Sequence, residues 1–214
     1  MAGTTRTLLA VLIATASLAA EAAGNPEAGR QKAAACMACH GPDGNSPADM
    51  WPKLAGQLPE YIVKQLQDFK AGRRQDEQMS PQAANLAEID MADIAAFFAA
   101  QTVKPGEAGK TKLALGEQIY RKGKGRPVPA TACLGCHGPA GAGNRDWGKT
   151  QSRVPTVLAP AIGGQHAAYL EKQLKAYRDG QRGNDAAGVM RELARGLTDH
   201  EVAALSAYVA TLKR

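Results

Sequence analysis

A five-residue pattern, Cys-x-x-Cys-His, occurs twice in the chain and accounts for all four of its cysteines. It reads "CMACH" at residues 36–40 and "CLGCH" at residues 133–137. Two thiols at this spacing can each form a thioether with a vinyl group of haem, and the histidine that follows can then reach the iron. The pattern therefore predicts two covalently bound haem c groups. The predicted attachment residues are Cys36, Cys39, Cys133 and Cys136, and the predicted axial iron ligands are His40 and His137.

Paired cysteines have three other common uses: a structural disulfide, a redox-active dithiol and a zinc site. A redox-active pair does not need the histidine that follows each pair here. A zinc site would bring four ligands together in one tetrahedron, whereas each cysteine pair here lies in its own copy of a repeated domain. The recurrence of the full pattern at the same place in each copy therefore favours haem.

The chain is an internal repeat. The segment "GQLPEYIVKQLQDFKAGRR" at 56–74 aligns with "GQHAAYLEKQLKAYRDGQR" at 164–182, and "WPKLAG" aligns with "APAIGG" just before them. A stretch rich in proline, glycine and lysine, "VKPGEAGK" at 103–110, is typical of a linker. These features predict two tandem domains, at residues 24–104 and 105–214, with insertions in the second around its first cysteine and around "RDWGKTQSRV".

Apolar residues recur at helical spacing in both halves. Ile62, Leu66 and Phe69 share one helical face, and their counterparts in the second half do the same. Opening helices are expected at 27–36 and 114–123, and the last helix of each half is expected to have Asp90 or Thr198 as its N-cap. No stretch alternates as a strand would, so the fold class is all-α. The long loops between helices suggest that each domain wraps around a large group.

The repeat also indicates the sixth iron ligand. Met79 aligns with Met190, which is the only methionine of the second half. The histidines outside the haem motifs, His166 and His200, align with leucine and isoleucine, and are expected to be surface or cap residues. We therefore predict His/Met ligation by His40 with Met79 and by His137 with Met190. The alternative for the two methionines is ordinary packing in the core.

A second motif, "GNRDWGKT" at 143–150, matches the P-loop pattern of nucleotide-binding proteins. No buried strand precedes it, and it lies in an insertion just after a haem motif. We interpret it as a solvated loop in which Trp147 packs against neighbouring structure.

The N-terminus has the pattern of a secretory signal peptide. One arginine precedes an apolar run from Leu8 to Ala20, and a small-residue cleavage site follows. A membrane anchor is the alternative, but the run of about 13 residues is shorter than the ~20 that span a bilayer. Residues 1–23 are therefore expected to be a signal peptide, and the protein is expected to be exported into an oxidising compartment.

Eight segments together carry a resemblance to a known family. The segments "CMACH", "CHGPDGN", "WPKLAGQ" and "QMSPQAANL", with their counterparts "CLGCH", "CHGPAGAGN", "APAIGGQ" and "GVMRELARGLTD", resemble the dihaem cytochromes c of the cytochrome c4 family. The resemblance covers essentially all of the chain after the signal peptide. It implies two class I cytochrome c domains, related by a pseudo-two-fold axis, each wrapped around one covalent haem, with the haems facing each other across the domain interface.

The resemblance carries further implications. The carbonyls of Pro52 and Pro160 would accept hydrogen bonds from His40 and His137. The protein would be a periplasmic electron carrier, with a quinol-oxidising complex or another donor and a terminal oxidase as acceptor, and would associate peripherally with the membrane. We expect redox proteins as partners and no nucleic acid.

Two functions remain open from the residues themselves. A carrier cycles each iron between Fe(III) and Fe(II), and methionine would fill the sixth position, which leaves no room for substrate. The alternative is a dihaem oxidoreductase or the haem subunit of a dehydrogenase, such as a peroxidase or a sulfur-compound dehydrogenase, which needs an open or displaceable position. The formal net charge is +6. The basic residues that form either a docking patch or an ordinary solvated face are Arg73, Arg74, Lys122, Lys124 and Arg126.

Overall fold

The computed structural model describes residues 24–106, 113–125, 129–146 and 158–214. Within these ranges the regular structure is helical, apart from two isolated β-bridges, Lys124 to Ala130 and Asn144 to Ala159. The all-α prediction is confirmed. The expected signal peptide, much of the expected linker, Arg126 and Trp147 lie outside the described residues. No helix in the described part is both long and apolar enough to cross a membrane.

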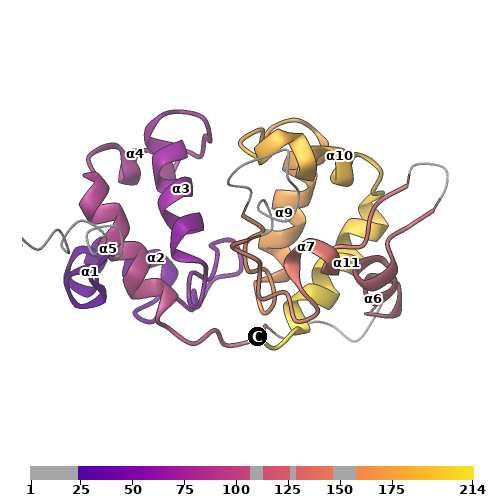
Figure 1. Ribbon diagram of the computed structural model, residues 1–214, viewed down its shortest axis with the longest axis horizontal. Helices are drawn as coiled ribbons and strands as arrows, with labels where there is room; N and C mark the ends of the chain where they lie inside the picture. Colours follow the sequence, from indigo (N-terminus) through magenta and orange to yellow (C-terminus); the bar gives the residue numbers. More distant parts are fainter. Residues whose placement is uncertain (1–23, 107–112, 126–128, 147–157) are drawn as a thin grey trace, which may run out of the picture.

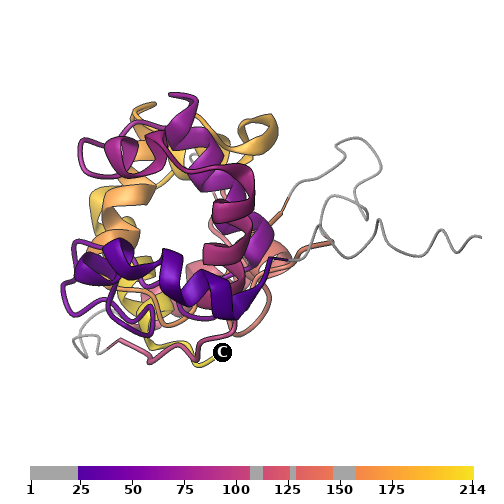
Figure 2. The ribbon, with the colours of Figure 1, turned by 90° about the vertical axis from the view of Figure 1, so that its left-hand side faces the viewer.

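Two helical halves lie side by side, and residues 100–106 pass between them at the lower edge of Figure 1. The first half contains α1 (Pro26–Lys32), α2 (Ala34–His40), α3 (Pro59–Lys70), α4 (Met79–Ala84) and α5 (Glu88–Ala99). The second half contains α6 (Leu113–Lys122), α7 (Leu134–His137), α9 (Ala167–Arg178), the 3₁₀ helix η1 (Ala186–Gly188), α10 (Val189–Arg195) and α11 (Asp199–Thr211). The view in Figure 2 looks along the pair of halves, with the first half in front of the second.

Two expectations about helix ends were wrong. The predicted opening helix at 27–36 is two helices, α1 and α2, because the backbone leaves helical geometry at Ala33. The last helix of the first half begins three residues before the expected start, with Ala87 as its N-cap. Asp90 lies one turn inside, where its carboxylate accepts a hydrogen bond from the Ala87 N–H at 3.1 Å. An acidic residue is stabilising in either position, so the sequence could not separate them.

Each half has its own apolar core. Phe97 and Phe98 of α5 have ring centroids 5.0 Å apart in the first half. Tyr120 of α6 and Tyr208 of α11 have centroids 5.6 Å apart in the second. The predicted helical face of α3 is buried against α5. Each copy of a duplicated domain needs its own apolar core, and each half of this chain has one.

A glycine allows the first and last helices of each half to cross closely. An ideal Cβ on Gly29 of α1 would lie 1.9 Å from the carbonyl oxygen of Asp93 in α5. A Cβ on Gly116 of α6 would lie 2.1 Å from the carbonyl oxygen of Ala204 in α11. Any side chain at either position would therefore push the two helices apart.

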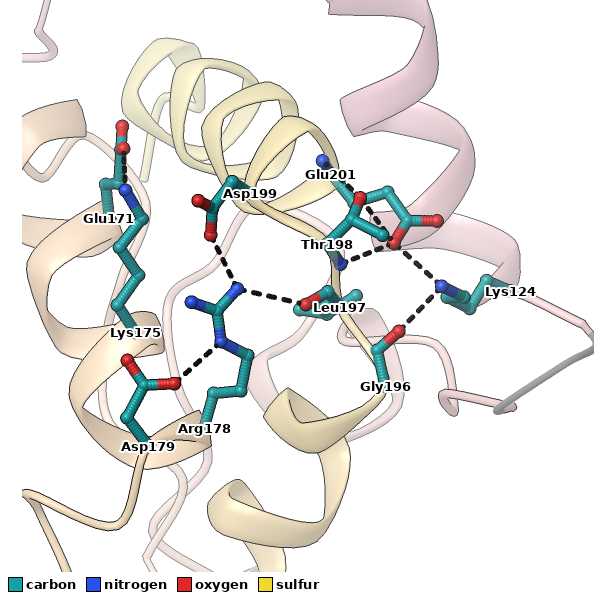
Figure 3. Close-up of polar contacts among 10 residues, drawn as sticks. All are labelled: Lys124, Glu171, Lys175, Arg178, Asp179, Gly196, Leu197, Thr198, Asp199 and Glu201. Carbon is teal, nitrogen blue, oxygen red and sulfur yellow. Dashed lines mark hydrogen bonds and ion pairs between the residues drawn. The ribbon is translucent and has the colours of Figure 1, made fainter.

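The start of α11 is held by a polar network, which Figure 3 shows. Thr198 is the N-cap as predicted, and it exchanges hydrogen bonds with Glu201 in a capping box. Lys124 donates to the Glu201 carboxylate at 2.7 Å and to the Gly196 carbonyl at 2.6 Å (Figure 3). The Lys124 side chain is only 13% exposed. Lys124 therefore stabilises the fold and is not part of a surface docking patch.

Candidate functional site

The eight residues predicted to attach and ligate haem line one cavity. Its volume is about 1010 Å³, and residues of both halves line it. The predicted site residues in its wall are Cys36, Cys39, His40, Met79, Cys133, Cys136, His137 and Met190. Most of the remaining wall is apolar, with Phe69 and Phe98 on one side and Leu170 and Leu205 on the other. The space and the donor set therefore fit a large apolar group in each half.

Short helices place each Cys-x-x-Cys-His motif at the cavity wall. α2 ends at His40 and α7 ends at His137. Each helix is followed by a glycine with positive φ, +80° at Gly41 and +77° at Gly138, a conformation that L-residues with side chains rarely adopt. The chain thus turns sharply away at the end of each motif, while the histidine ring stays at the cavity wall.

Both histidine rings are held in the same way. The Nδ1 of His40 lies 2.8 Å from the Pro52 carbonyl oxygen, and the Nδ1 of His137 lies 2.8 Å from that of Pro160. A carbonyl can only accept, so each Nδ1 carries the proton and each Nε2 keeps a free lone pair. Burial lowers the pKa of both imidazoles, and the carbonyl bonds offset this only in part. Both rings are therefore neutral and oriented, as metal-binding histidines are.

The cysteines do not have the properties of reactive thiolates. None of the four forms a disulfide. Burial raises the pKa of Cys133 to about 11, and it also raises the pKa of Cys36. A redox-active cysteine has a lowered pKa instead. No three histidine, cysteine or acidic side chains in the described residues gather as a metal site would require, which weighs against the zinc alternative.

The two methionines occupy equivalent positions despite dissimilar surroundings. Met79 is the first residue of α4, and its N–H donates to the Asp76 carboxylate at 3.1 Å. Met190 is the second residue of α10 and follows Ala187 and Gly188, which both have positive φ. Each methionine thus enters the cavity from the first turn of a short helix. The aligned sequences around them share little, so the equivalence of their places rests on the fold.

The other candidate ligands are placed differently. His166 caps α9, and its Nε2 lies 2.9 Å from the Ser46 carbonyl oxygen of the first half. His200 is exposed on α11. Met91 is 1% exposed within the core. Met50 does border the cavity, but its side chain is 58% exposed.

An arginine from each half reaches across the cavity wall to the other half. Arg74 donates to the Tyr169 hydroxyl at 3.1 Å and to Gln173 at 3.0 Å. Arg182 donates to the Tyr61 hydroxyl at 2.9 Å. No carboxylate among the described residues lies within ion-pair distance of either guanidinium. Arg74 is therefore an interface residue, which is neither of the two roles, docking patch or solvated face, that the sequence left open for it.

This interface was not recognised from the sequence. Tyr61 and Gln65 match Tyr169 and Gln173 in the repeat, so the signal was present. Polar residues on a helix are usually solvated, and only the placement of α3 near α9 brings these four together with the two arginines. Polar residues that recur in both copies of a duplicated domain are thus candidates for the interface between them.

Comparisons with known proteins show which family the chain resembles. The cytochrome c family model matches residues 26–101 and 114–213. Cytochrome c4 of Pseudomonas aeruginosa is 44% identical over 94% of this chain and 96% of its own length. The crystal structure of reduced recombinant cytochrome c4 from Pseudomonas stutzeri superposes with a TM-score of 0.78, at 42% identity, over 89% of this chain and all of that one. A thiosulfate dehydrogenase electron acceptor of Thiomonas intermedia is 34% identical, over 84% of this chain and 79% of its own length.

Proposed function

The chain belongs to the cytochrome c4 family of dihaem electron-transfer proteins, and we propose that it works in the periplasm between a quinol-oxidising complex or another donor and a terminal oxidase. Its two tandem class I cytochrome c domains carry two covalent haem c groups. Bound haem supplies the Fe(III)/Fe(II) couple, and two haems allow the protein to hold two electrons. A domain boundary near residue 104 and a signal peptide at 1–23 are part of the proposal.

The proposed roles of the site residues follow from their places in the cavity. Cys36, Cys39, Cys133 and Cys136 would attach the two haems through thioethers, and His40 and His137 would each bind an iron; all six residues line the cavity. The observation that carries this assignment is the matched pair of Nδ1 contacts to Pro52 and Pro160, which leaves each Nε2 free to bind iron. Oriented, neutral imidazoles of this kind are the rule at metal sites.

Met79 and Met190 would each supply the second protein ligand of an iron; both line the cavity. A thioether sulfur favours Fe(II) over Fe(III) more than a second imidazole does, so His/Met ligation raises the reduction potential. It would also leave no open position on the iron for substrate. Both effects suit transfer of electrons rather than chemistry on a small molecule.

Arg74 and Arg182 are proposed to face the haem propionates. Both line the cavity, and neither has a carboxylate partner in the described part of the chain. Arg182 is buried and Arg74 is half-buried, and a guanidinium that has lost water without gaining an anion is costly, since neutral groups compensate its charge only in part. Propionates carry negative charge and would enter the cavity with the haems. Tyr61 and Tyr169 would then fix the two guanidinium groups in place.

A second candidate function is supported by one comparison. Because a thiosulfate dehydrogenase electron acceptor is 34% identical to this chain, a dehydrogenase of sulfur compounds is the alternative electron donor. In that case the chain would act as an acceptor or as a haem subunit. The same haem sites would serve either role.

Kinetics with purified partners would test the proposal. The reduced protein is mixed with a terminal oxidase and oxygen, and its reoxidation is followed by stopped-flow absorption. The proposal predicts reoxidation that is fast relative to respiratory turnover and slows as salt is added, since charged surfaces guide such encounters. In a parallel reaction the oxidised protein is mixed with thiosulfate dehydrogenase and thiosulfate. Rapid reduction there, with no reaction at the oxidase, would replace the first proposal with the second.

A further inference from the structure

Two buried glutamine side chains exchange hydrogen bonds with the backbone of the opposite half. Gln57 of the first half pairs with Ala161: its Nε2 donates to the Ala161 carbonyl at 2.8 Å, and its Oε1 accepts from the Ala161 N–H at 2.8 Å. Gln165 of the second half pairs with Lys53 in the same way, at 2.9 Å and 2.7 Å. Gln57 and Gln165 occupy equivalent positions in the repeat, and so do Lys53 and Ala161.

Each of these pairs involves the peptide group that also holds a haem-site histidine. The Ala161 N–H and the Pro160 carbonyl belong to one peptide group, and that carbonyl accepts from His137. A continuous path therefore runs from His137 Nδ1 through the Pro160–Ala161 peptide to Gln57 of the other half. The mirror path runs from His40 through the Pro52–Lys53 peptide to Gln165.

The contacts are well shielded from water. Gln57 and Gln165 are 7% and 5% exposed, and their partners Ala161 and Lys53 are 2% and 5% exposed. Each amide oxygen receives an N–H and each amide nitrogen meets a carbonyl, so the partners fix the orientation of both amides. Hydrogen bonds in such a low-dielectric setting polarise their neighbours more than they would in water.

The hydrogen bond from the peptide N–H to the glutamine should lower the reduction potential of the haem that the peptide's histidine binds. An acceptor on the peptide N–H increases the negative charge on the carbonyl oxygen of the same peptide. The carbonyl then binds the Nδ1 proton of the histidine more strongly, which makes the ring a more basic ligand. A more basic axial ligand favours Fe(III) and lowers the reduction potential.

We propose that Gln57 and Gln165 are positioning residues that act crosswise: each tunes the axial histidine, and through it the reduction potential, of the haem in the opposite half. The proposal rests on the axial roles proposed for His40 and His137. On this proposal the domain interface sets the reduction potentials of the two haems in addition to holding the two halves together.

Reduction potentials resolved for each haem would test the proposal. In the holoprotein, Gln57→Leu removes the acceptor from the Ala161 N–H. It should raise the midpoint of the second-half haem, with a two- to threefold change in its reduction equilibrium, and change the first-half haem less. Gln165→Leu should produce the mirror result. The midpoints are measured by spectroelectrochemistry and assigned to each half by NMR of the haem methyl groups. The matched control is Gln101→Leu, because among the described residues the Gln101 amide bonds to Phe97 of its own half, and it should move neither midpoint.

A second variant covers the case in which the leucine variants do not fold. Gln57→Glu keeps an oxygen acceptor at the Ala161 N–H, and its greater negative charge should lower the midpoint of the second-half haem more than that of the first. Larger shifts in the haem of the mutated half, or equal shifts in both, would overturn the proposal. The axial ligands are tested separately by the spectrum of the unmodified protein, so failure of the proposed ligation and failure of the crosswise effect can be told apart.

Discussion

The guanidinium of Arg182 donates a hydrogen bond to the hydroxyl of Tyr61 across the boundary between the two halves, at 2.9 Å. Arg182 is 7% exposed, and its side chain also lies over the ring of Tyr177, with its central carbon 4.5 Å from the ring centroid. The guanidinium of Arg182, which belongs to the second half, is thus held at the cavity wall by Tyr61 of the first half. This relationship connects the stability of the interface with the electrostatics of the haem sites.

Removing that charge should lower the reduction potentials. In the holoprotein, Arg182→Gln takes away a buried positive charge that favours Fe(II) over Fe(III). We expect about a tenfold change in the reduction equilibrium, which is about 59 mV for one electron. Spectroelectrochemical titration measures this, and Arg182→Lys should restore most of the shift because it keeps the charge.

Arg73 of the first half provides the control for this charge effect. Its side chain is 60% exposed and pairs with Asp68 outside the cavity. Arg73→Gln should change the midpoints far less than Arg182→Gln. Equal shifts in the two variants would mean that Arg182 has no special relation to the haem sites.

Because α1 and α5 cross closely at Gly29, we expect that adding one methyl group there lowers the stability of the protein. Gly29→Ala would bring a Cβ to 1.9 Å from the Asp93 carbonyl oxygen, so the helices must separate. We expect a loss of about 1–3 kcal/mol in the free energy of unfolding, measured by chemical denaturation of the holoprotein.

Gly135 is the matched control for this substitution. A Cβ there would meet nothing within 4 Å, and the first half has Ala38 at the equivalent position of its motif. Gly135→Ala should be neutral or stabilising, because alanine is the better helix former. Similar losses for the two variants would contradict the crossing as the cause.

The contact between Asp43 and Lys104 predicts a pH dependence. Lys104 follows α5 at the end of the first half, and its ammonium lies 2.7 Å from the Asp43 carboxylate. That hydrogen bond lowers the pKa of Asp43 from 3.8 to about 2, although desolvation opposes it. Because the folded-state pKa is lowered, the stabilisation is complete above pH of about 4 and is lost as the pH falls toward 2.

Thermal unfolding of Asp43→Asn would test this dependence. The pair is exposed to solvent, so its contribution at neutral pH should be about 0.5–1 kcal/mol. The variant should melt below the unmodified protein at pH 6, and the difference should shrink between pH 4 and pH 2. A difference that stays constant across this range would exclude the carboxylate as its source.

We expect that replacing Ser206 by alanine does not lower the stability of the protein. Its hydroxyl is buried at the cavity wall and has no hydrogen-bond partner among the described residues. The equivalent residue of the first half is Ala95, which is fully buried. Because an unsatisfied buried hydroxyl costs free energy, Ser206→Ala should leave stability unchanged or raise it by about 1 kcal/mol. A lower melting temperature of the holoprotein would indicate that the hydroxyl binds a group inside the cavity.

Much of the fold and the site could be predicted from the repeat. The Cys-x-x-Cys-His motifs indicated the haem sites, and the alignment of Met79 with Met190 selected two residues that the fold places equivalently. The crossing glycine Gly29 was not predicted, because its importance depends on how closely two helices approach in space. Ala87 was not predicted as an N-cap, because its side chain has no acceptor that would mark it.

The interface residues were the hardest to predict from the sequence. Gln57 and Arg74 have ordinary polar side chains, and each could equally lie in solvent. Their partners Ala161 and Tyr169 come from the other half, more than 90 residues away in the chain. Their recurrence in the repeat, as Gln165 and Arg182, marks them as candidates for the interface, but only the relative placement of the two domains decides which contacts they make.

The central claim is that each half holds a covalent haem whose iron is bound by histidine nitrogen on one side and methionine sulfur on the other. The absorption spectrum of the oxidised protein tests it most directly, with Met79→Ala and Met190→Ala measured beside it. We expect the weak long-wavelength sulfur-to-iron band in the unmodified protein, about half of it in each variant, and rapid carbon monoxide binding to one reduced haem only after a methionine is removed. A spectrum without that band, or rapid carbon monoxide binding by the unmodified reduced protein, would contradict the claim.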